Sequence, residues 1–175
     1  MLKKLFKQDV DFIYALLEGS FPADEYRTYE EQKGIFDDPR YTAYGFCGDD
    51  GKLLGFVSVW ELKEIVFVEH LAVLSGFRGR GIGSELLSGI ALQTDKQVCL
   101  EVEPPLDEES RRRIAFYEKN GFFFNDFPYV QPPMTEGKRE IPLFIMTGRC
   151  AADRKMFEKI KTTLYTEIYK TEKKY

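Results

Sequence analysis

A run of glycines and arginines carries the clearest chemical signal in this chain. Residues 77–87 read Phe-Arg-Gly-Arg-Gly-Ile-Gly-Ser-Glu-Leu-Leu, between an apolar run at Ile65–Leu74 and a helix-like run at Ser84–Thr94. A glycine-rich turn that leads into a helix leaves backbone N–H groups without partners, and the helix dipole adds positive potential behind them. Because glycine has no side chain, an anion can approach this backbone closely. The loop therefore predicts a phosphate-binding site.

The spacing of this loop differs from that of two common nucleotide-binding loops. Gly79, Gly81 and Ser84 lack the third glycine of G-x-G-x-x-G, and no Lys-Ser/Thr pair follows as in a P-loop. A plain glycine-rich turn or an RGG-like RNA contact is the alternative. RNA binding needs a wide basic surface, and the formal net charge of -4 argues against one. We therefore expect no nucleic acid among the partners.

Three motifs in this part of the chain, in this order, resemble those of the GNAT superfamily of N-acetyltransferases. Arg78-x-x-Gly81-x-Gly83 resembles the coenzyme A pyrophosphate loop of that family, R/Q-x-x-G-x-G/A. A Leu-Ala-Val segment at residues 71–73 precedes the loop, and residues 115–122 resemble the family's A-x-F-Y-x-x-x-G-F helix end. The resemblance implies that acetyl-CoA binds to Leu71, Ala72, Val73, Arg78, Gly79, Arg80, Gly81, Ile82, Gly83 and Ser84.

The same resemblance implies a mechanism of acetyl transfer. In the family the thioester lies where two parallel strands splay, here Ile65–Leu74 and Val98–Val102, and a backbone N–H of Ala72 or Val73 would face its carbonyl. Tyr117 matches the family tyrosine that protonates the departing thiolate. A phenol with a pKa near 10 is a reasonable acid toward a thiolate. A packing role on an amphipathic helix is the alternative for Tyr117.

Two carboxylates and a water molecule are the candidates for accepting the proton of the attacking amine. Strand alternation places Glu69 on one face of its strand, although a β-bulge would reverse that order locally. Family members often carry an acidic residue or histidine at this point, so Glu69 is the first candidate. Glu101 is the second and is expected to share a strand face with Glu103; a water molecule is the third. His70 adjoins the site but is more typical of a packing residue.

One departure from the family pattern follows the second splayed strand. Many relatives carry an asparagine there, whereas residues 104–113 have none. Ser110 is a substitute for it, and the arginines at 111–113 are candidates for the adenosine phosphate, with a solvated helix face as the alternative. A non-catalytic coenzyme A-binding module of the same fold is the alternative function, but such a module would need neither Glu69 nor Tyr117.

The acceptor side of the site is defined less sharply. In the family it is built from the early helices and the loop between the last strands, here residues 20–26 and 127–133. Glu25 and Tyr129 are therefore the candidates for substrate binding. Asp24 and Glu25 favour a small cationic amine or a peptide amine as the acceptor.

Composition indicates a single compact domain in the cytoplasm. The 175 residues, 43% of them hydrophobic, can supply one core. Three cysteines without C-x-x-C spacing and a single histidine suggest neither a disulfide framework nor a metal site, so no metal cofactor is expected. Asp9 and Asp11 interrupt the apolar run that a signal peptide needs, and no stretch is apolar enough to span a membrane.

The order of predicted elements is that of an α/β (α+β) protein. Strands are predicted at 2–6, 41–47, 53–62, 65–74, 98–102, 122–124 and 141–146, and helices at 9–19, 24–36, 84–94 and 107–120. Gly121 is predicted to adopt the left-handed conformation after a helix end. This order matches the mixed, splayed sheet flanked by helices that the resemblance implies.

A further helix is predicted beyond the family core. Asp153–Tyr169 places Phe157, Ile160, Leu164 and Ile168 on one face. We therefore divide the chain into an acetyltransferase domain at 1–150 and a C-terminal helix with a polar tail at 151–175, packed on that domain. A homodimer contact is the alternative for the apolar face.

Overall fold

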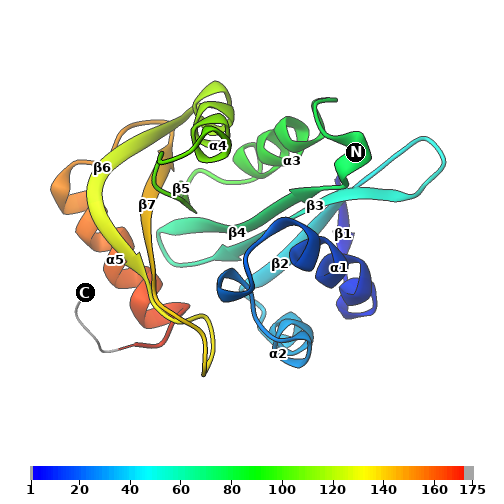
Figure 1. Ribbon diagram of the computed structural model, residues 1–175, viewed down its shortest axis with the longest axis horizontal. Helices are drawn as coiled ribbons and strands as arrows, with labels where there is room; N and C mark the ends of the chain where they lie inside the picture. Colours follow the sequence, from blue (N-terminus) through cyan, green and yellow to red (C-terminus); the bar gives the residue numbers. More distant parts are fainter. Residues whose placement is uncertain (1, 172–175) are drawn as a thin grey trace. The chain divides into compact units, whose positions relative to one another are not determined.

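The computed structural model describes residues 2–171, which form two compact units that join between Lys96 and Gln97. Both units combine strands with helices, as predicted, and Figure 1 shows their elements. No helix in residues 2–171 is both long and apolar enough to cross a membrane.

The first unit is built on four antiparallel strands. They follow one another in the sheet as in the chain: β1 (Leu2–Leu5), β2 (Tyr41–Cys47), β3 (Leu53–Glu61) and β4 (Ile65–Val73). In Figure 1, helix α3 (Ile82–Ala91) lies on one side of this sheet, and α1 (Val10–Ser20) and α2 (Tyr29–Gly34) lie on the other. The fully buried side chains come from both helices and strands and include Leu17, Phe56, Phe67 and Leu86.

The segment between α1 and α2 contains only the single 3-10 turn η2 (Ala23–Glu25). We predicted one helix over 24–36, but the structure divides this stretch into η2, α2 and the 3-10 turn η3 (Ile35–Asp37). The break comes at Thr28, which has an extended backbone and caps α2 by accepting a hydrogen bond from the N–H of Glu31. A capping box of this kind starts a new helix, so the preceding residues are free to follow another path.

The second unit contains a three-stranded antiparallel sheet in the order β5-β7-β6. Its strands are β5 (Gln97–Val102), β6 (Phe122–Gln131) and β7 (Ile141–Gly148). Helix α4 (Glu108–Lys119) packs on β5 and β6, and α5 (Arg154–Glu167) packs on β6. The predicted apolar face of the last helix is buried in this unit, where the Phe157 ring lies 5.0 Å from that of Phe127.

One predicted boundary in this unit is wrong. We expected a strand to end at Phe124 and a long loop to follow, but β6 continues to Gln131. The pairing with β7 shifts register between Asn125 and Tyr129, so Pro128 lies within the irregular stretch. A bulge accommodates a proline inside a strand, because the ladder needs no N–H there. Tyr129 consequently belongs to a strand and not to a loop.

Candidate active site

The glycine loop has the local geometry that an anion site requires. Gly79 and Gly81 have φ angles of 76° and 84°, in the left-handed region that favours glycine. Gly81 is the N-cap of α3 and has no side-chain cap, so the first-turn N–H groups of this helix lack intrahelical acceptors. Apart from the glycine's own chain neighbours, no heavy atom of the described residues lies within 4 Å of the point where a Cβ would stand at either glycine. This open, uncapped helix start fits a pyrophosphate group.

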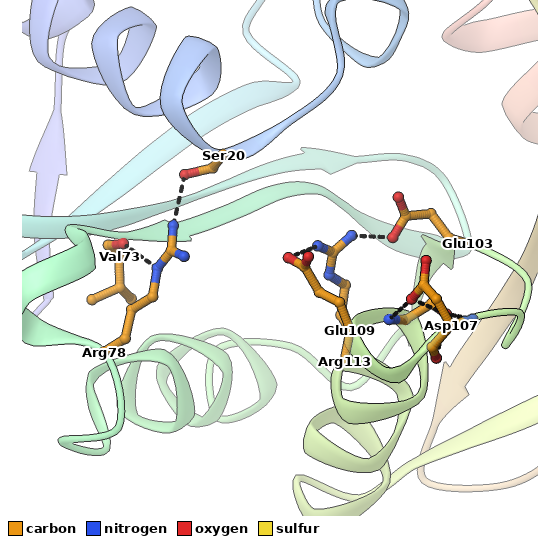
Figure 2. A network of polar contacts seen from close by, with 8 residues as sticks. Ser20, Val73, Arg78, Glu103, Asp107, Glu109 and Arg113 are labelled. Atoms are coloured by element: carbon orange, nitrogen blue, oxygen red, sulfur yellow. Dashed lines mark hydrogen bonds and ion pairs between the residues drawn. The ribbon is translucent and has the colours of Figure 1, made fainter.

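Arg78, at the start of the loop, is held in a defined orientation (Figure 2). Its Nε donates to the carbonyl oxygen of Val73 at 3.1 Å, and its Nη2 donates to Ser20 Oγ at 3.4 Å. Arg78 therefore links the end of β4 to the end of α1, and its exposed side chain keeps its charge beside the loop. The neighbouring Arg80 guanidinium lies over the Phe77 ring at 5.0 Å.

A β-bulge in β4 places Glu69. The β3–β4 pairing runs from Ser58 opposite His70 directly to Val59 opposite Val68, which leaves Glu69 as an extra residue. Strict alternation would send Glu69 and His70 to opposite faces. In the structure both contact the α1–α2 segment, because the bulge reverses the alternation locally.

Glu69 is a buried, ion-paired carboxylate. Arg27 Nη1 donates to Glu69 Oε1 at 2.8 Å, and the two side chains are 8% and 1% exposed. Burial raises the pKa of the Glu69 carboxyl, but the Arg27 charge and the neighbouring His70 outweigh that effect and lower it from 4.5 to about 2. At neutral pH the group is therefore anionic and a weak proton acceptor.

This ion pair predicts a characteristic loss of stability in acid. The folded pKa of Glu69 lies below its unfolded value, so the contribution is complete above about pH 4.5 and is lost as pH falls toward about 2. We expect Glu69→Gln to lower the free energy of unfolding by about 3 kcal/mol at pH 7, since it removes the carboxylate charge that pairs with the buried Arg27 guanidinium. The difference in the free energy of unfolding between this variant and wild type should be smaller at pH 3 than at pH 7, as measured by denaturant titration.

Glu61→Gln is the control for that measurement. Glu61 accepts from Lys96 Nζ at 2.9 Å, but its side chain is 65% exposed. An exposed pair contributes about 0–1 kcal/mol, so this variant should behave like wild type at both pH values. A pH-independent deficit in Glu69→Gln would contradict the ion-pair explanation and indicate lost packing.

Glu101 lies in a different setting, among tyrosines of the second unit. It accepts a hydrogen bond from the Tyr129 hydroxyl of β6. Tyr169, which follows α5, donates to both of its carboxylate oxygens, at 2.9 and 2.7 Å. Burial, followed by the charge of Glu101, raises the pKa of Tyr129 well above its usual value, so this phenol remains a neutral donor.

The prediction that Glu103 shares a strand face with Glu101 is wrong. Strand β5 ends at Val102, so its alternation does not extend to Glu103. Glu103 pairs instead with Arg113 of α4, which also contacts Glu109 (Figure 2). Ser110, the proposed substitute for the family asparagine, is buried and completes a capping box with Asp107 at the start of α4.

Tyr117 is buried near the end of α4. Its ring lies 5.9 Å from that of Phe122. Gly121 has a φ of 82°, in the left-handed region as predicted. Burial raises the pKa of the Tyr117 hydroxyl to about 12, with Arg113 opposing the shift and Glu103 adding to it. The phenol therefore retains its proton across the physiological range.

The two candidate substrate residues occupy different settings. The Glu25 carbonyl oxygen is 2.9 Å from His70 Nε2, and Glu25 belongs to the turn η2. Tyr129 is 3% exposed. Sequence reasoning missed Arg27 and Tyr169, the partners of Glu69 and Glu101. Neither belongs to a motif, and only the folded chain brings each to its carboxylate.

Comparisons with known proteins identify the family. The model of the acetyltransferase (GNAT) domain matches residues 41–122. A candidate GNAT acetyltransferase from Bacteroides thetaiotaomicron, known as a solved structure, is 31% identical, with 98% of this chain and 99% of that chain covered and a TM-score of 0.87. A curated relative, the candidate acetyltransferase YjbC of Bacillus subtilis, is 26% identical over 93% of this chain and 84% of its own length.

Two less similar solved structures share the fold. A chimera of the spermidine N-acetyltransferase SpeG of Vibrio cholerae is 16% identical, covers 85% of this chain and 93% of its own, and has a TM-score of 0.65. The ribosomal-protein-S18-alanine N-acetyltransferase of Escherichia coli is 18% identical, covers 87% of this chain and 95% of its own, and has a TM-score of 0.64. The predicted α+β fold is confirmed, and the chain belongs to the GNAT family of acetyltransferases and is an acyltransferase.

Proposed function

We propose that this protein transfers the acetyl group of acetyl-CoA to a primary amine by direct attack. The observation that carries the proposal is the open glycine loop at the uncapped start of α3, with Gly79 and Gly81 at positive φ. Backbone N–H groups there can bind two phosphates without help from a metal ion or a lysine.

The residues that would hold acetyl-CoA lie close together in the chain, in β4 and in the loop that follows it. Residues 78–84 would bind the pyrophosphate, with the Arg78 guanidinium adding positive charge. The backbone of Leu71, Ala72 and Val73 in β4 would pair with the pantetheine arm and direct an N–H to the thioester carbonyl. This N–H would stabilise the negative charge that develops on the oxygen as the amine attacks.

Tyr117 is the proposed acid. The amine nitrogen bonds to the carbonyl carbon, the carbon–sulfur bond breaks, and the thiolate takes the phenolic proton. Support comes from the match to the family motif and from the raised pKa, about 12, which keeps the phenol protonated.

Glu101 is the better of the two carboxylates to receive the proton that leaves the amine, directly or through water. Two neutral phenols, Tyr129 and Tyr169, donate hydrogen bonds to Glu101. Glu69, in contrast, is neutralised by Arg27 in a buried ion pair. An ion pair with a buried arginine lowers the pKa of a carboxyl and makes it a weaker proton acceptor, which favours Glu101 over Glu69.

The proposed acceptor is a small cationic amine or a peptide amine. Asp24 and Glu25 bring negative charge to the turn η2, as a cationic acceptor requires. Two proteins of the same fold support these classes, since their names describe acetylation of spermidine and of an alanine of a ribosomal protein.

A thiol-release assay tests the proposal. The protein is incubated with acetyl-CoA and a panel that contains spermidine and a short peptide with an N-terminal alanine. We expect release of coenzyme A that depends on the amine, with the acetylated amine seen by mass spectrometry. Tight binding of acetyl-CoA without amine-dependent release across the panel would contradict the proposal and favour a coenzyme A-binding module.

A further inference from the structure

The α1–α2 segment, residues 21–28, is fastened to β4 at two adjacent positions. Arg27 Nη1 bonds to Glu69 Oε1 at 2.8 Å, and His70 Nε2 lies 2.9 Å from the Glu25 carbonyl oxygen. Since a carbonyl only accepts, the hydrogen of this second bond belongs to His70 Nε2. The side chains of Arg27, Glu69 and His70 are 8%, 1% and 2% exposed. Both contacts are therefore shielded from water. Such contacts are stronger in the low dielectric of a protein interior than in water.

The β4 bulge makes this double attachment possible. Because Glu69 is the extra residue of β4, it and His70 both reach the α1–α2 segment. The main chain at His70 is fixed in turn by a hydrogen bond from its N–H to Ser58 Oγ, and its ring meets the Phe21 ring edge-on at 5.0 Å. A bulge that aims two neighbouring polar side chains at one segment is a specific arrangement, of the kind that re-aims side chains next to active sites.

Arg27 also has an aromatic contact. Its guanidinium lies 5.6 Å from the centroid of the Trp60 ring, which supports the cation from another direction. A buried guanidinium fixed by a carboxylate and a ring has little freedom to move. The backbone of residue 27 is fixed with it.

The environment of Glu69 suits an anchor better than a base. An efficient general base has a pKa near the working pH, whereas Arg27 and His70 hold the pKa of Glu69 far below it. Glu69 Oε2 and His70 Nδ1 lie 3.6 Å apart and, among the described residues, neither has a hydrogen-bond partner. Both atoms are buried, so neither is exposed to solvent.

We infer that Arg27 is a positioning residue for acetyl transfer. Glu69 and His70 contribute by holding the α1–α2 segment in place, and neither accepts the proton of the amine. The inference rests on the proposed amine acetylation, because it assigns acceptor binding to this segment. Fixing residues 21–28 fixes Asp24 and Glu25, the acidic residues proposed to attract a cationic acceptor. Loss of the anchor should therefore weaken acceptor binding more than it slows the chemical step.

Hydrogen–deuterium exchange tests the anchor without any substrate. We expect amides of residues 21–28 to exchange at least about tenfold faster in Arg27→Gln and Glu69→Gln than in wild type. If the Gln variants prove too unstable, Arg27→Lys replaces them, because it keeps the charge but not the planar fork of the guanidinium. Its amides at residues 21–28 should exchange faster than in wild type, but less so than expected for the Gln variants. Arg40→Gln is the matched control, since Arg40 lies 5.9 Å from the same Trp60 ring but pairs with Asp38. Unchanged exchange in residues 21–28 of both Gln variants would overturn the inference.

Kinetics with spermidine and with the alanine peptide as probe acceptors test the functional part. We expect Arg27→Gln and Glu69→Gln to raise the acceptor KM by about tenfold, to leave kcat within about threefold, and to leave the KM for acetyl-CoA unchanged. The double variant should be no worse than either single one, because it removes both charges of the buried pair.

The pH profile separates an anchor from a base. If Glu69 acts as an anchor, the fold loss in kcat/KM stays constant as pH rises. A loss confined to Glu69→Gln that shrinks with rising pH would identify Glu69 as the proton acceptor and overturn the inference. If wild type acetylates neither probe, the proposed function fails for these acceptors, while the exchange experiment still decides whether the anchor exists.

Discussion

Replacing Gly81 by leucine should weaken acetyl-CoA binding by at least about a hundredfold, measured by calorimetry. The reason is steric: a side chain at this position enters the open space in front of the uncapped start of α3, where the phosphates are proposed to bind. Two charge-assisted hydrogen bonds from backbone N–H groups are then lost, at about 1.5–3 kcal/mol each. Gly81→Ala should give a smaller loss, because a methyl group intrudes less.

The leucine also carries a conformational cost, and a control must separate it from the steric effect. Gly81 has a φ of 84°, where any residue with a Cβ is strained by about 1–2 kcal/mol. Gly51 in the β2–β3 turn has a φ of 77° and comparably open surroundings within the described chain. Gly51→Leu should therefore lose similar stability and keep full affinity for acetyl-CoA. Wild-type affinity in Gly81→Leu would place the pyrophosphate elsewhere.

The parts of the site that could be predicted from sequence are those fixed by local backbone chemistry. Gly79, Gly81 and Gly121 all adopt left-handed conformations that glycine reaches without strain, so residue type and spacing indicate where the backbone turns. The hairpin strands β2 and β3 were placed correctly for a related reason, since the turn between them carries Gly48 and Gly51. Local rules suffice wherever neighbours in sequence determine the conformation.

The electrostatics of the carboxylates could not be predicted in this way. Glu69 looks like an accessible strand acid in the sequence, but a bulge turns it toward Arg27, 42 positions earlier in the chain. Glu101 likewise obtains Tyr169 from the far end of the chain, 68 positions later. Whether a carboxylate accepts a proton, anchors a segment or only contributes negative charge depends on such distant partners. Hydrophobic periodicity in the sequence does not identify them.

Tyr129 shows a second kind of limit. Residues 127–133 were predicted to belong to a loop, and the proline at position 128 cannot donate to a strand ladder. The β6–β7 register shift between Asn125 and Tyr129 resolves that conflict locally, and the strand resumes beyond it. Tyr129 therefore lies buried in a strand beside Glu101 and not in the predicted loop.

Tyr117→Phe should lower kcat by about 10²–10⁴ and leave the Kd for acetyl-CoA nearly unchanged, measured by thiol release and by calorimetry. The substitution removes one hydroxyl and keeps the ring that packs on Phe122. Tyr165→Phe is the matched control: the two tyrosines are 8% and 7% exposed, and the Tyr165 hydroxyl bonds to the Val130 carbonyl at 2.7 Å. That variant should lose stability through its broken hydrogen bond but retain kcat.

The pH dependence distinguishes an acid from a packing residue. With a pKa of about 12, Tyr117 stays protonated through the range in which kcat is measurable, so its ionisation should produce no fall in the wild-type kcat below about pH 11. The deficit of the Phe variant should accordingly be a constant factor across that range, including the alkaline part where the acceptor amine is already deprotonated. A deficit that vanished at alkaline pH would assign the lost proton transfer to the amine and not to the thiolate. Wild-type kcat throughout would make Tyr117 a core residue, and the thiolate would then take its proton from water.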